Sequence, residues 1–389
     1  MFKSRVKNSC GGIVFGVIFF FGSIALLWYN EGRSVKRYRA LNDVESAVIK
    51  IDPNKIYLAN EGQPVYFSST LRSPTNIIDP IFGAGSSNDL KLRRDVEIYQ
   101  WVENVKKTSR KTASGTRVTT KSYTYRKEWR SDLVDSETFK RRDGHHNPSS
   151  VPYESETFTA NPINAGAYNL TEDLIDRLTW FKDLDGVSTE SITDVTVRSA
   201  TKQFGDKLYI GRSADPNNPN VGDITIAFQV VPSGTVSLIA EQVGNTLTTY
   251  STKKGSEILL LQPGTVSLEM LLNDARSENK MWAWILRFAG FVIMFMSLNA
   301  LVGPLKIFVD IIPILGDIIE CGLSLVSFVV AFTVSSIVIA IAWIAYRPML
   351  ALFGIVLPVA FISLSVLYLQ RRKTAKTDEN TKLFHAVIV

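Results

Sequence analysis

The sequence predicts a multi-pass α-helical membrane protein with four transmembrane helices and a large β-rich α+β luminal domain. Three observations support this prediction. One apolar stretch lies at residues 11–29, and three more lie between residues 282 and 369. The intervening residues 30–281 are mixed in polarity, with short runs in which apolar and polar side chains alternate, and such alternation is typical of half-buried β-strands.

Residues 11–29 form the first predicted transmembrane helix. The stretch carries no charged residue, and about 20 apolar residues at ~1.5 Å rise per residue cross a hydrocarbon layer of ~30 Å. The alternative is a cleaved signal peptide, because basic residues precede the stretch. The stretch is long, however, and ends in Trp28-Tyr29 instead of a small-residue cleavage site. A retained anchor that follows a cytosolic tail, residues 1–10, is therefore favoured.

The other three predicted transmembrane helices are residues 282–302, 321–345 and 349–369. Four crossings place both termini on one side of the membrane. The tail, residues 370–389, begins with basic residues directly after the last span, and the positive-inside rule places such a flank in the cytosol. We therefore expect both termini to be cytosolic and residues 30–281 to be luminal. Residues 303–320 are expected to lie along the cytosolic interface or to re-enter the membrane.

Aromatic residues at the ends of the spans agree with this topology. Trp and Tyr rings prefer the headgroup level, where one part of the ring stays apolar and the other is hydrated. In the predicted topology six of them meet at the luminal face: Trp28, Tyr29, Trp282, Trp284, Trp343 and Tyr346.

Composition limits the classes of function. The chain has 389 residues, of which 46% are hydrophobic, and a formal net charge of +6. A pI near 9.1 is compatible with nucleic-acid binding, but basic flanks of membrane spans account for much of this excess, so we expect no nucleic-acid partner. Cys10 and Cys321 are the only cysteines and both lie at membrane boundaries, so the large domain has no disulfide framework.

Within residues 30–281, strands are predicted around Val96–Trp101, Tyr123–Trp129 and Ile224–Phe228. Turn signals such as Ser233-Gly234 follow at close spacing and favour antiparallel hairpins. Two helices interrupt the strands. One carries a stripe of Leu174, Ile175, Leu178 and Phe181; the other starts near Ser267, carries Leu268, Leu271, Leu272 and Ala275, and is expected to run into the second span.

A basic segment without acidic residues extends from Asn104 to Arg126. It contains Lys106, Lys107, Arg110, Lys111, Arg117 and Lys121 around a Thr-Ala-Ser-Gly turn. One interpretation is a finger that binds anions or lipid headgroups. The favoured interpretation is a solvated hairpin tip or a mobile loop.

Asn169 begins the only acceptable glycosylation sequon, Asn169-Leu170-Thr171, because the other candidate contains Pro148. Thr171 is also suited to the N-cap of a helix. A glycan at Asn169 would place residues 30–281 in the lumen.

No catalytic or metal site is predicted, and no cofactor is expected. The adjacent His145 and His146 follow Asp143-Gly144, which is favourable turn chemistry, and have no Cys or HxxxH-type partner. No nucleophile elbow, Walker loop or dinucleotide-binding fingerprint is present in the sequence. We therefore predict that the protein is not an enzyme.

Polar residues in or next to the predicted spans are candidates for function, because such groups are costly in hydrocarbon unless they are paired, hydrated or able to reach the interface. They are Arg287, Asn299, Asp310, Asp317 and Arg347. Arg287 and Arg347 are close enough to span ends to act as interfacial anchors. Gly12 and Gly16 form a Gly-x-x-x-Gly pattern that permits close helix packing.

Several different short motifs follow one another along the chain in a specific order. They include Glu31-Gly32-Arg33, Glu97-Ile98-Tyr99-Gln100-Trp101, Tyr125-Arg126-Lys127-Glu128-Trp129, His146-Asn147-Pro148-Ser149 and Tyr346-Arg347-Pro348. In this order they resemble the LUMA family, four-pass proteins of the endoplasmic reticulum and inner nuclear membrane. The resemblance covers about residues 30–371.

The resemblance implies a role in organising the nuclear envelope, with self-association and contacts with lamins, emerin and SUN-domain proteins. It supplies no catalytic residue. We therefore expect a non-enzymatic membrane scaffold whose partners are membrane lipids, further copies of itself and envelope proteins. The alternative is a channel or lipid-handling protein, which requires Arg287, Asn299 and Asp317 to converge on one cavity. A luminal enzyme would instead require a deep pocket with clustered titratable groups.

Overall fold

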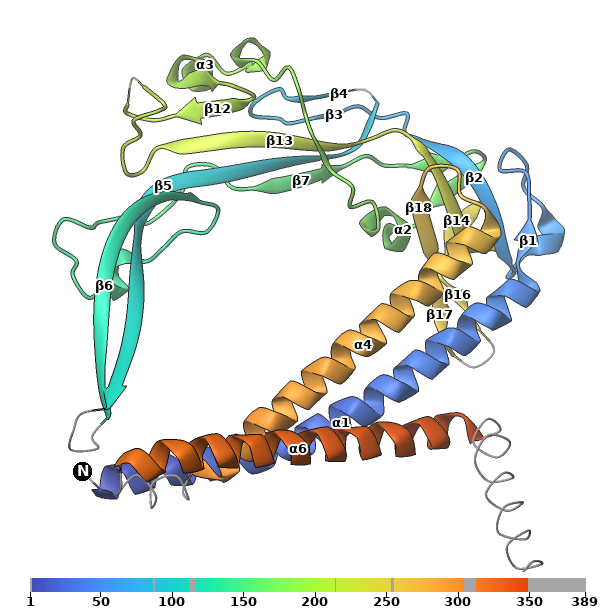
Figure 1. The fold of residues 1–389 in the computed structure, drawn as a ribbon. Helices are drawn as coiled ribbons and strands as arrows, with labels where there is room; N and C mark the ends of the chain where they lie inside the picture. The colour runs from blue at the N-terminus through green and yellow to red at the C-terminus, as the bar shows by residue number, and fades with distance from the viewer. Residues whose placement is uncertain are drawn as a thin grey trace, which may run out of the picture. The chain divides into compact units, whose positions relative to one another are not determined.

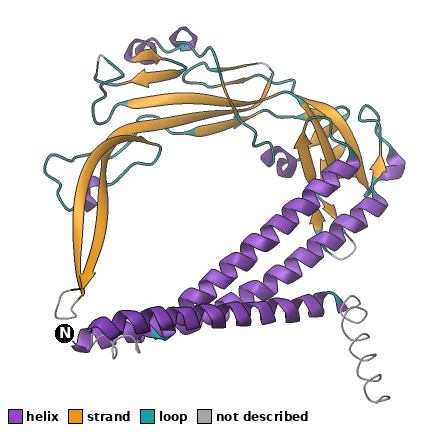
Figure 2. Ribbon diagram, viewed as in Figure 1, coloured by secondary structure: helices purple, strands orange, loops and turns teal. Residues whose placement is uncertain are grey.

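The structure is a computed structural model that describes residues 2–86, 88–111, 117–213, 215–252, 255–303 and 313–348. The chain divides into two compact units. The membrane unit comprises Met1–Arg39 and Glu278–Val389, and the β-rich unit comprises Ala40–Ser277. Figure 1 labels the helices and strands, and Figure 2 distinguishes them by colour.

Three helices among the described residues are long and apolar enough to cross a membrane. They are α1 (Phe2–Ala47), α4 (Leu268–Leu301) and α6 (Pro313–Tyr346). The fourth predicted span, residues 349–369, and the tail, residues 370–389, lie outside the described residues. The described residues therefore show three candidate membrane helices and a large β-rich domain.

Helices α1 and α6 differ at their boundaries from those expected from the sequence. Helix α1 begins at Phe2, within the predicted tail of residues 1–10. Helix α1 continues beyond residue 29 to Ala47, because Leu41 and Val44 keep one apolar face of the helix buried. Helix α6 begins at Pro313, within the predicted linker 303–320. Proline is favoured in the first turn of a helix, where its missing N–H costs no hydrogen bond.

The three helices of the membrane unit run in alternating directions. Gly16 near the start of α1 lies beside Leu301 at the end of α4, whereas Asn30 further along α1 donates to the carbonyl of Ala283. Helices α1 and α4 are therefore antiparallel. Ser324 near the start of α6 donates to Asn299, and further contacts follow in reverse order, so α6 is antiparallel to α4.

The β-rich unit contains two seven-stranded sheets. The first has the order β1 (Ile49–Lys50), β2 (Pro64–Arg72), β8 (Asn164–Ala165), β9 (Tyr168–Leu170), β15 (Thr246–Thr248), β14 (Thr235–Val243) and β18 (Leu260–Pro263). Because β2 also pairs with β14, the strands from β2 to β14 form a closed ring of pairings. Pairs β1–β2 and β9–β15 are parallel, and the other pairs of this sheet are antiparallel.

The second sheet is antiparallel and contains the longest strands. Its order is β11 (Thr201–Phe204), β12 (Lys207–Ile210), β13 (Ile224–Pro232), β5 (Asp89–Lys111) and β6 (Arg117–Arg130), with β10 (Lys182–Asp183) on β13 and β7 (Glu156–Thr159) on β5. Two small hairpins complete the strands: β3 (Ile77–Ile78) with β4 (Gly85–Ser86), and β16 (Tyr250–Ser251) with β17 (Glu257–Ile258). The short helix α3 (Val195–Ala200) precedes β11.

The Ser233-Gly234 turn does not close a hairpin, contrary to the expectation from the sequence. Strand β13 before the turn pairs in the second sheet with β5. Strand β14 after the turn pairs in the first sheet with β2. The turn therefore carries the chain from one sheet to the other, because each strand finds its partner in a distant part of the sequence.

The predicted helix around residue 175 is shorter than its apolar stripe. Helix α2 covers only Glu172–Asp176. Leu174 and Leu178 are fully buried, but Phe181 lies beyond the helix, where Lys182–Asp183 joins β13 as strand β10. Strand pairing therefore takes over where the periodicity predicts further helix.

Both faces of the first sheet are buried. Phe67 and Leu238 point into the main core that the sheets share, whereas their neighbours Tyr66 and Ile239 point into a second apolar cluster. This second cluster contains Leu41 and Val44 of α1 and Leu271, Leu272 and Ala275 of α4. The stripe expected after Ser267 is therefore the surface with which α4 covers the sheet.

Candidate functional site

The polar residues of the membrane unit form a network between α1 and α4. Glu31 is only 1% exposed and accepts two hydrogen bonds from Arg287, from Nε to Oε1 at 2.6 Å and from Nη2 to Oε2 at 2.9 Å. The guanidinium also lies 4.9 Å from the ring centroid of Trp284. A carboxylate and a guanidinium in this bidentate arrangement neutralise each other where water is scarce.

Neighbouring amides extend the network along the two helices. Asn279 donates to the backbone oxygen of Ser34 at 2.9 Å, and Asn30 donates to that of Ala283 at 2.9 Å. Arg33 donates to both amide oxygens, at 3.4 and 3.5 Å. Three of these bonds join α1 to α4, and the bond from Arg33 to Asn30 holds the Asn30 side chain that makes one of them. The network therefore sets the register of α1 on α4.

Sequence reasoning placed Arg287 at the interface as an anchor but missed its partner, Glu31. That residue follows the predicted end of the first span, and it lies opposite Arg287 only because α1 continues past residue 29. The available signal was a single acid in the Glu31-Gly32-Arg33 motif.

Asn299 belongs to a separate contact, between α4 and α6. Its amide donates to the backbone oxygen of Phe295 at 3.0 Å, and its oxygen accepts from Ser324 at 3.2 Å. Twelve residues separate it from Arg287, which is about 18 Å along a helix at ~1.5 Å per residue. The two predicted residues therefore do not meet.

Arg347 follows the end of α6, where its guanidinium lies 5.8 Å from the ring centroid of Trp343. The adjacent Tyr346 contacts Trp28 with ring centroids 5.8 Å apart, and its carbonyl accepts from Arg39 at 2.6 Å. The middle of α1, at Trp28, therefore lies beside the end of α6. Asp310 lies outside the described residues; Asp317 lies in α6, but its side chain is also outside them.

The glycine pattern of α1 faces α4. A Cβ added to Gly16 would lie 2.9 Å from Leu301 Cγ and 3.0 Å from the backbone oxygen of Ser297, so the helices approach closely there. A Cβ on Gly12 would lie 3.9 Å from the oxygen of Ala300, an ordinary contact distance. Leu27 of α1 packs closely against Gly290 of α4, where an added Cβ would lie 2.6 Å from Leu27 Cδ2.

The basic segment forms most of the β5–β6 hairpin. The described side chains of Lys106, Lys107, Arg110 and Lys121 are exposed. Lys111 and Arg117 are paired strand residues whose side chains, like the tip at residues 112–116, lie outside the described part. A groove of about 610 Å³ beside the hairpin is lined by Glu103, Val105, Lys107, Lys121, Tyr123, Thr138, Phe139, Lys140 and Arg142.

The predicted histidine turn packs on the base of this hairpin. The His145 ring stacks on Tyr125 at 4.0 Å between centroids and meets Trp101 edge-on at 4.6 Å. The Tyr125 hydroxyl donates to Glu103 at 2.6 Å, and burial is the main cause that raises the pKa of this phenol. In the described part of the chain, no three His, Cys, Asp or Glu side chains are grouped to hold a metal ion.

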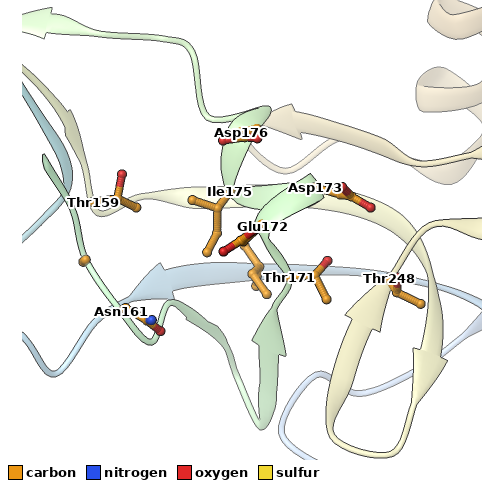
Figure 3. A pocket seen from close by; sticks show the side chains of 10 residues that line it. Thr159, Asn161, Thr171, Glu172, Asp173, Ile175, Asp176 and Thr248 are labelled. Atoms are coloured by element: carbon orange, nitrogen blue, oxygen red, sulfur yellow. The ribbon is translucent and has the colours of Figure 1, made fainter. Parts of the chain in front are cut away.

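A groove beside α2 has the clearest collection of carboxylates, and Figure 3 shows it. Its lining includes Glu172, Asp173 and Asp176 together with Thr159 and Thr248. The Asp176 side chain is 85% exposed, and the carboxylates stand apart from one another on the short helix (Figure 3). They do not form the close pair or the nucleophile and base that acid–base or covalent catalysis needs.

Asn169 lies in β9, between β8 and β15. It is half-buried, and its backbone N–H donates to Asn245 at 2.8 Å. Thr171 stands at the N-cap position of α2, but its hydroxyl donates to Leu247 instead of capping the helix. The sequon is therefore integrated into an interior strand of the first sheet.

Comparisons with known proteins agree on one group of relatives. The family model described as "Transmembrane protein 43" matches residues 98–348. The chain is 35% identical to the mouse protein of that name over 361 residues, which cover 90% of this chain and 88% of the relative. Identity to the human protein is 34% over 362 residues, with the same coverage. A Drosophila melanogaster homolog is 27% identical over 351 residues, 87% of this chain and 89% of the relative. No solved structure matches.

Proposed function

Because the chain belongs to the transmembrane protein 43 family, the LUMA family of the sequence resemblance, we propose that it is a non-enzymatic integral membrane scaffold. In this proposal the helices anchor the protein in the endoplasmic reticulum and inner nuclear membrane. The β-rich unit lies in the lumen and offers a surface to other membrane proteins. The scaffold self-associates, and its partners include lamins, emerin and SUN-domain proteins.

One observation carries the proposal: the Glu31–Arg287 ion pair and the Asn299–Ser324 hydrogen bond join different pairs of helices at separate levels. Glu31 and Arg287 satisfy each other, whereas Asn299 bonds to α6. A transport path needs polar groups that line a common hydrated route. Polar groups that bond across helices instead specify packing, which is the requirement of an anchor.

The orientation of the helices supports the proposed topology. Helices α1, α4 and α6 alternate in direction, so Trp28 and Tyr346 come together at one level of the unit. Trp284 lies beside Arg287 near the same level, because Asn30 of α1 bonds to Ala283. An aromatic and cationic band of this kind is typical of the headgroup level of a bilayer.

Self-association tests the scaffold directly. The full chain, purified in mild detergent and moved to nanodiscs, should contain more than one copy per particle by mass photometry at nanomolar concentration. The same preparation in liposomes should leave an imposed potassium gradient intact. A monomer that dissipates the gradient would instead establish the channel alternative. Proximity labelling from the β-rich unit should recover membrane proteins of the envelope and reticulum.

Cysteine labelling tests the topology, because the chain has only two cysteines to remove. In a Cys10→Ser/Cys321→Ser background, Val195→Cys introduces a thiol at a residue that is 74% exposed. A membrane-impermeant maleimide should label this thiol in sealed microsomes only after detergent is added. A cysteine appended to the C-terminus is the matched control and should be labelled without detergent. The reverse pattern would refute the luminal placement.

A further inference from the structure

The outer part of the β5–β6 hairpin is a two-stranded arm. The pairing of β13 with β5 ends at Ile98, and the pairing of β7 with β5 ends at Arg94. From Val102 onward β5 pairs only with β6 among the described strands, and Figure 1 shows this arm extending past the rest of the sheet. The arm is roughly 30 Å long at ~3.3 Å per residue. A ribbon of two strands is marginally stable in water by itself, so fold stability alone does not explain its length.

The pairing register concentrates positive charge on the arm. Lys107 lies directly opposite Lys121, and Lys111 directly opposite Arg117. Lys107 and Ser109 are two residues apart on β5, and their partners Lys121 and Thr119 lie opposite them, so the Lys107–Lys121 pair shares one face with Ser109. Like charges directly across a pair of strands repel each other. Such an arrangement is unfavourable unless an anion neutralises it.

The carboxylate of Glu103 also lines this groove, and one of its oxygens is already engaged. Glu103 accepts hydrogen bonds from the Tyr125 hydroxyl and from the backbone N–H of Lys140, both at 2.6 Å. Among the described residues, neither Lys107 nor Lys121 forms an ion pair. The two lysines are therefore free to contact an external anion.

Apolar and aromatic side chains accompany the cations. Val105 is 44% exposed on the same face, beside Tyr123, and Phe139 from the following loop completes the wall of the groove. Val118 is 48% exposed on the opposite face. Cations interleaved with an exposed valine and a half-buried tyrosine match the boundary between headgroups and acyl chains better than they match a fully hydrated polyanion.

We propose that this face of the arm docks onto a bilayer surface that carries anionic phospholipid headgroups. The lysines contact phosphate oxygens, and Val105 and Tyr123 enter the shallow apolar layer beneath them. The same chain carries three helices that qualify as membrane spans, so the arm belongs to a chain that is itself tethered to a membrane. Tethering raises the effective concentration of the lipid surface. This inference does not depend on self-association or on the proposed partners.

Vesicle flotation with the full chain tests the proposal. Protein held in nanodiscs of neutral phosphatidylcholine is mixed with vesicles of phosphatidylcholine alone or with added phosphatidylserine. Wild-type protein should float with the anionic vesicles and not with the neutral ones. Each cation near an anionic surface changes partitioning about fivefold, so Lys107→Gln/Lys121→Gln should lower it roughly 25-fold. Binding should weaken as salt is raised, because exposed charges are screened.

The matched control is Lys50→Gln/Lys182→Gln, which removes the same charge from exposed strand residues of the same unit. It should float like the wild type. Circular dichroism should show the wild-type fold for both pairs, because the substituted side chains are exposed. The thermal midpoint of Lys107→Gln/Lys121→Gln should not fall, since the substitution removes a like-charge pair. Equal flotation of both pairs, or equal binding to neutral vesicles, would overturn the proposal. Capture of soluble polyglutamate without capture of anionic vesicles would also overturn it and would indicate an acidic protein partner.

Discussion

The bidentate pair between Glu31 and Arg287 should be strongly coupled in stability. The Glu31 side chain is 1% exposed and the Arg287 side chain 22% exposed, so the two substitutions should not be equivalent. Arg287→Met leaves a buried carboxylate without its cation. Glu31→Gln leaves a cation that still lies over Trp284 and has a long stem with which to reach the headgroups.

The magnitudes follow from this burial. Removing one partner of a buried ion pair costs about 3–5 kcal/mol, which we expect for Arg287→Met. For Glu31→Gln we expect about 1–3 kcal/mol, the range for a partly satisfied polar group. The double variant removes both charges and should lie within about 2 kcal/mol of the wild type, since replacing a whole buried pair is often nearly neutral.

The assay is a double-mutant cycle on the free energy of unfolding, measured by denaturing-detergent titration of the full chain in mixed micelles. Glu137→Gln is the control, because the Glu137 and Arg142 side chains are 68% and 57% exposed and such pairs contribute at most about 1 kcal/mol. If the effects of Glu31→Gln and Arg287→Met add within about 0.5 kcal/mol, the two residues are independent. Our account of the network would then be wrong.

Three further predictions concern packing and pH. Gly16→Ala should lower the free energy of unfolding in detergent by about 1–3 kcal/mol because of overpacking, whereas Gly12→Ala should have little effect; equal effects would contradict the contact distances. Burial raises the pKa of the Asp89 carboxyl, and Asp89 Oδ2 has no hydrogen-bond partner among the described residues. The charged form therefore destabilises the fold as pH rises through this pKa, and Asp89→Asn should stabilise the protein by roughly 1 kcal/mol at pH 7 but not near pH 3; a pH-independent difference in thermal denaturation would refute this. Burial and a hydrogen bond to Asp223 raise the pKa of Tyr209, so unfolding should become easier as pH rises above ~10, the pKa of an unperturbed phenol. Tyr209→Phe should cost about 1–3 kcal/mol at pH 7 and flatten that alkaline dependence; an unchanged alkaline slope would contradict the assignment.

Much of the local structure could be predicted from the sequence. The alternation around Val96–Trp101 lies in β5, and the apolar stripe after Ser267 forms the start of α4. The resemblance to the LUMA family is confirmed by the match to transmembrane protein 43 over most of the chain. These features depend on residues near each other in sequence, where periodicity and hydrophobicity are visible.

Partnerships between distant residues could not be predicted in the same way. Ser233-Gly234 has the composition of a hairpin turn, yet its flanking strands join different sheets. Helix α2 ends early because Lys182–Asp183 pairs with β13. The groove beside the β5–β6 hairpin combines residues from the arm with Phe139 and Lys140 of the following loop, a combination that the basic segment alone did not reveal.

The sequence by itself determined that this protein enters a membrane, which segments are apolar enough to do so, and that a β-rich unit separates the first of them from the rest. Transfer of apolar side chains from water is a property of each segment, so it is readable in order along the chain. Only the tertiary structure decided that Glu31 meets Arg287 across 256 positions and that Lys107 faces Lys121. Burial and strand register set those contacts, and both depend on how remote parts of the chain pack together.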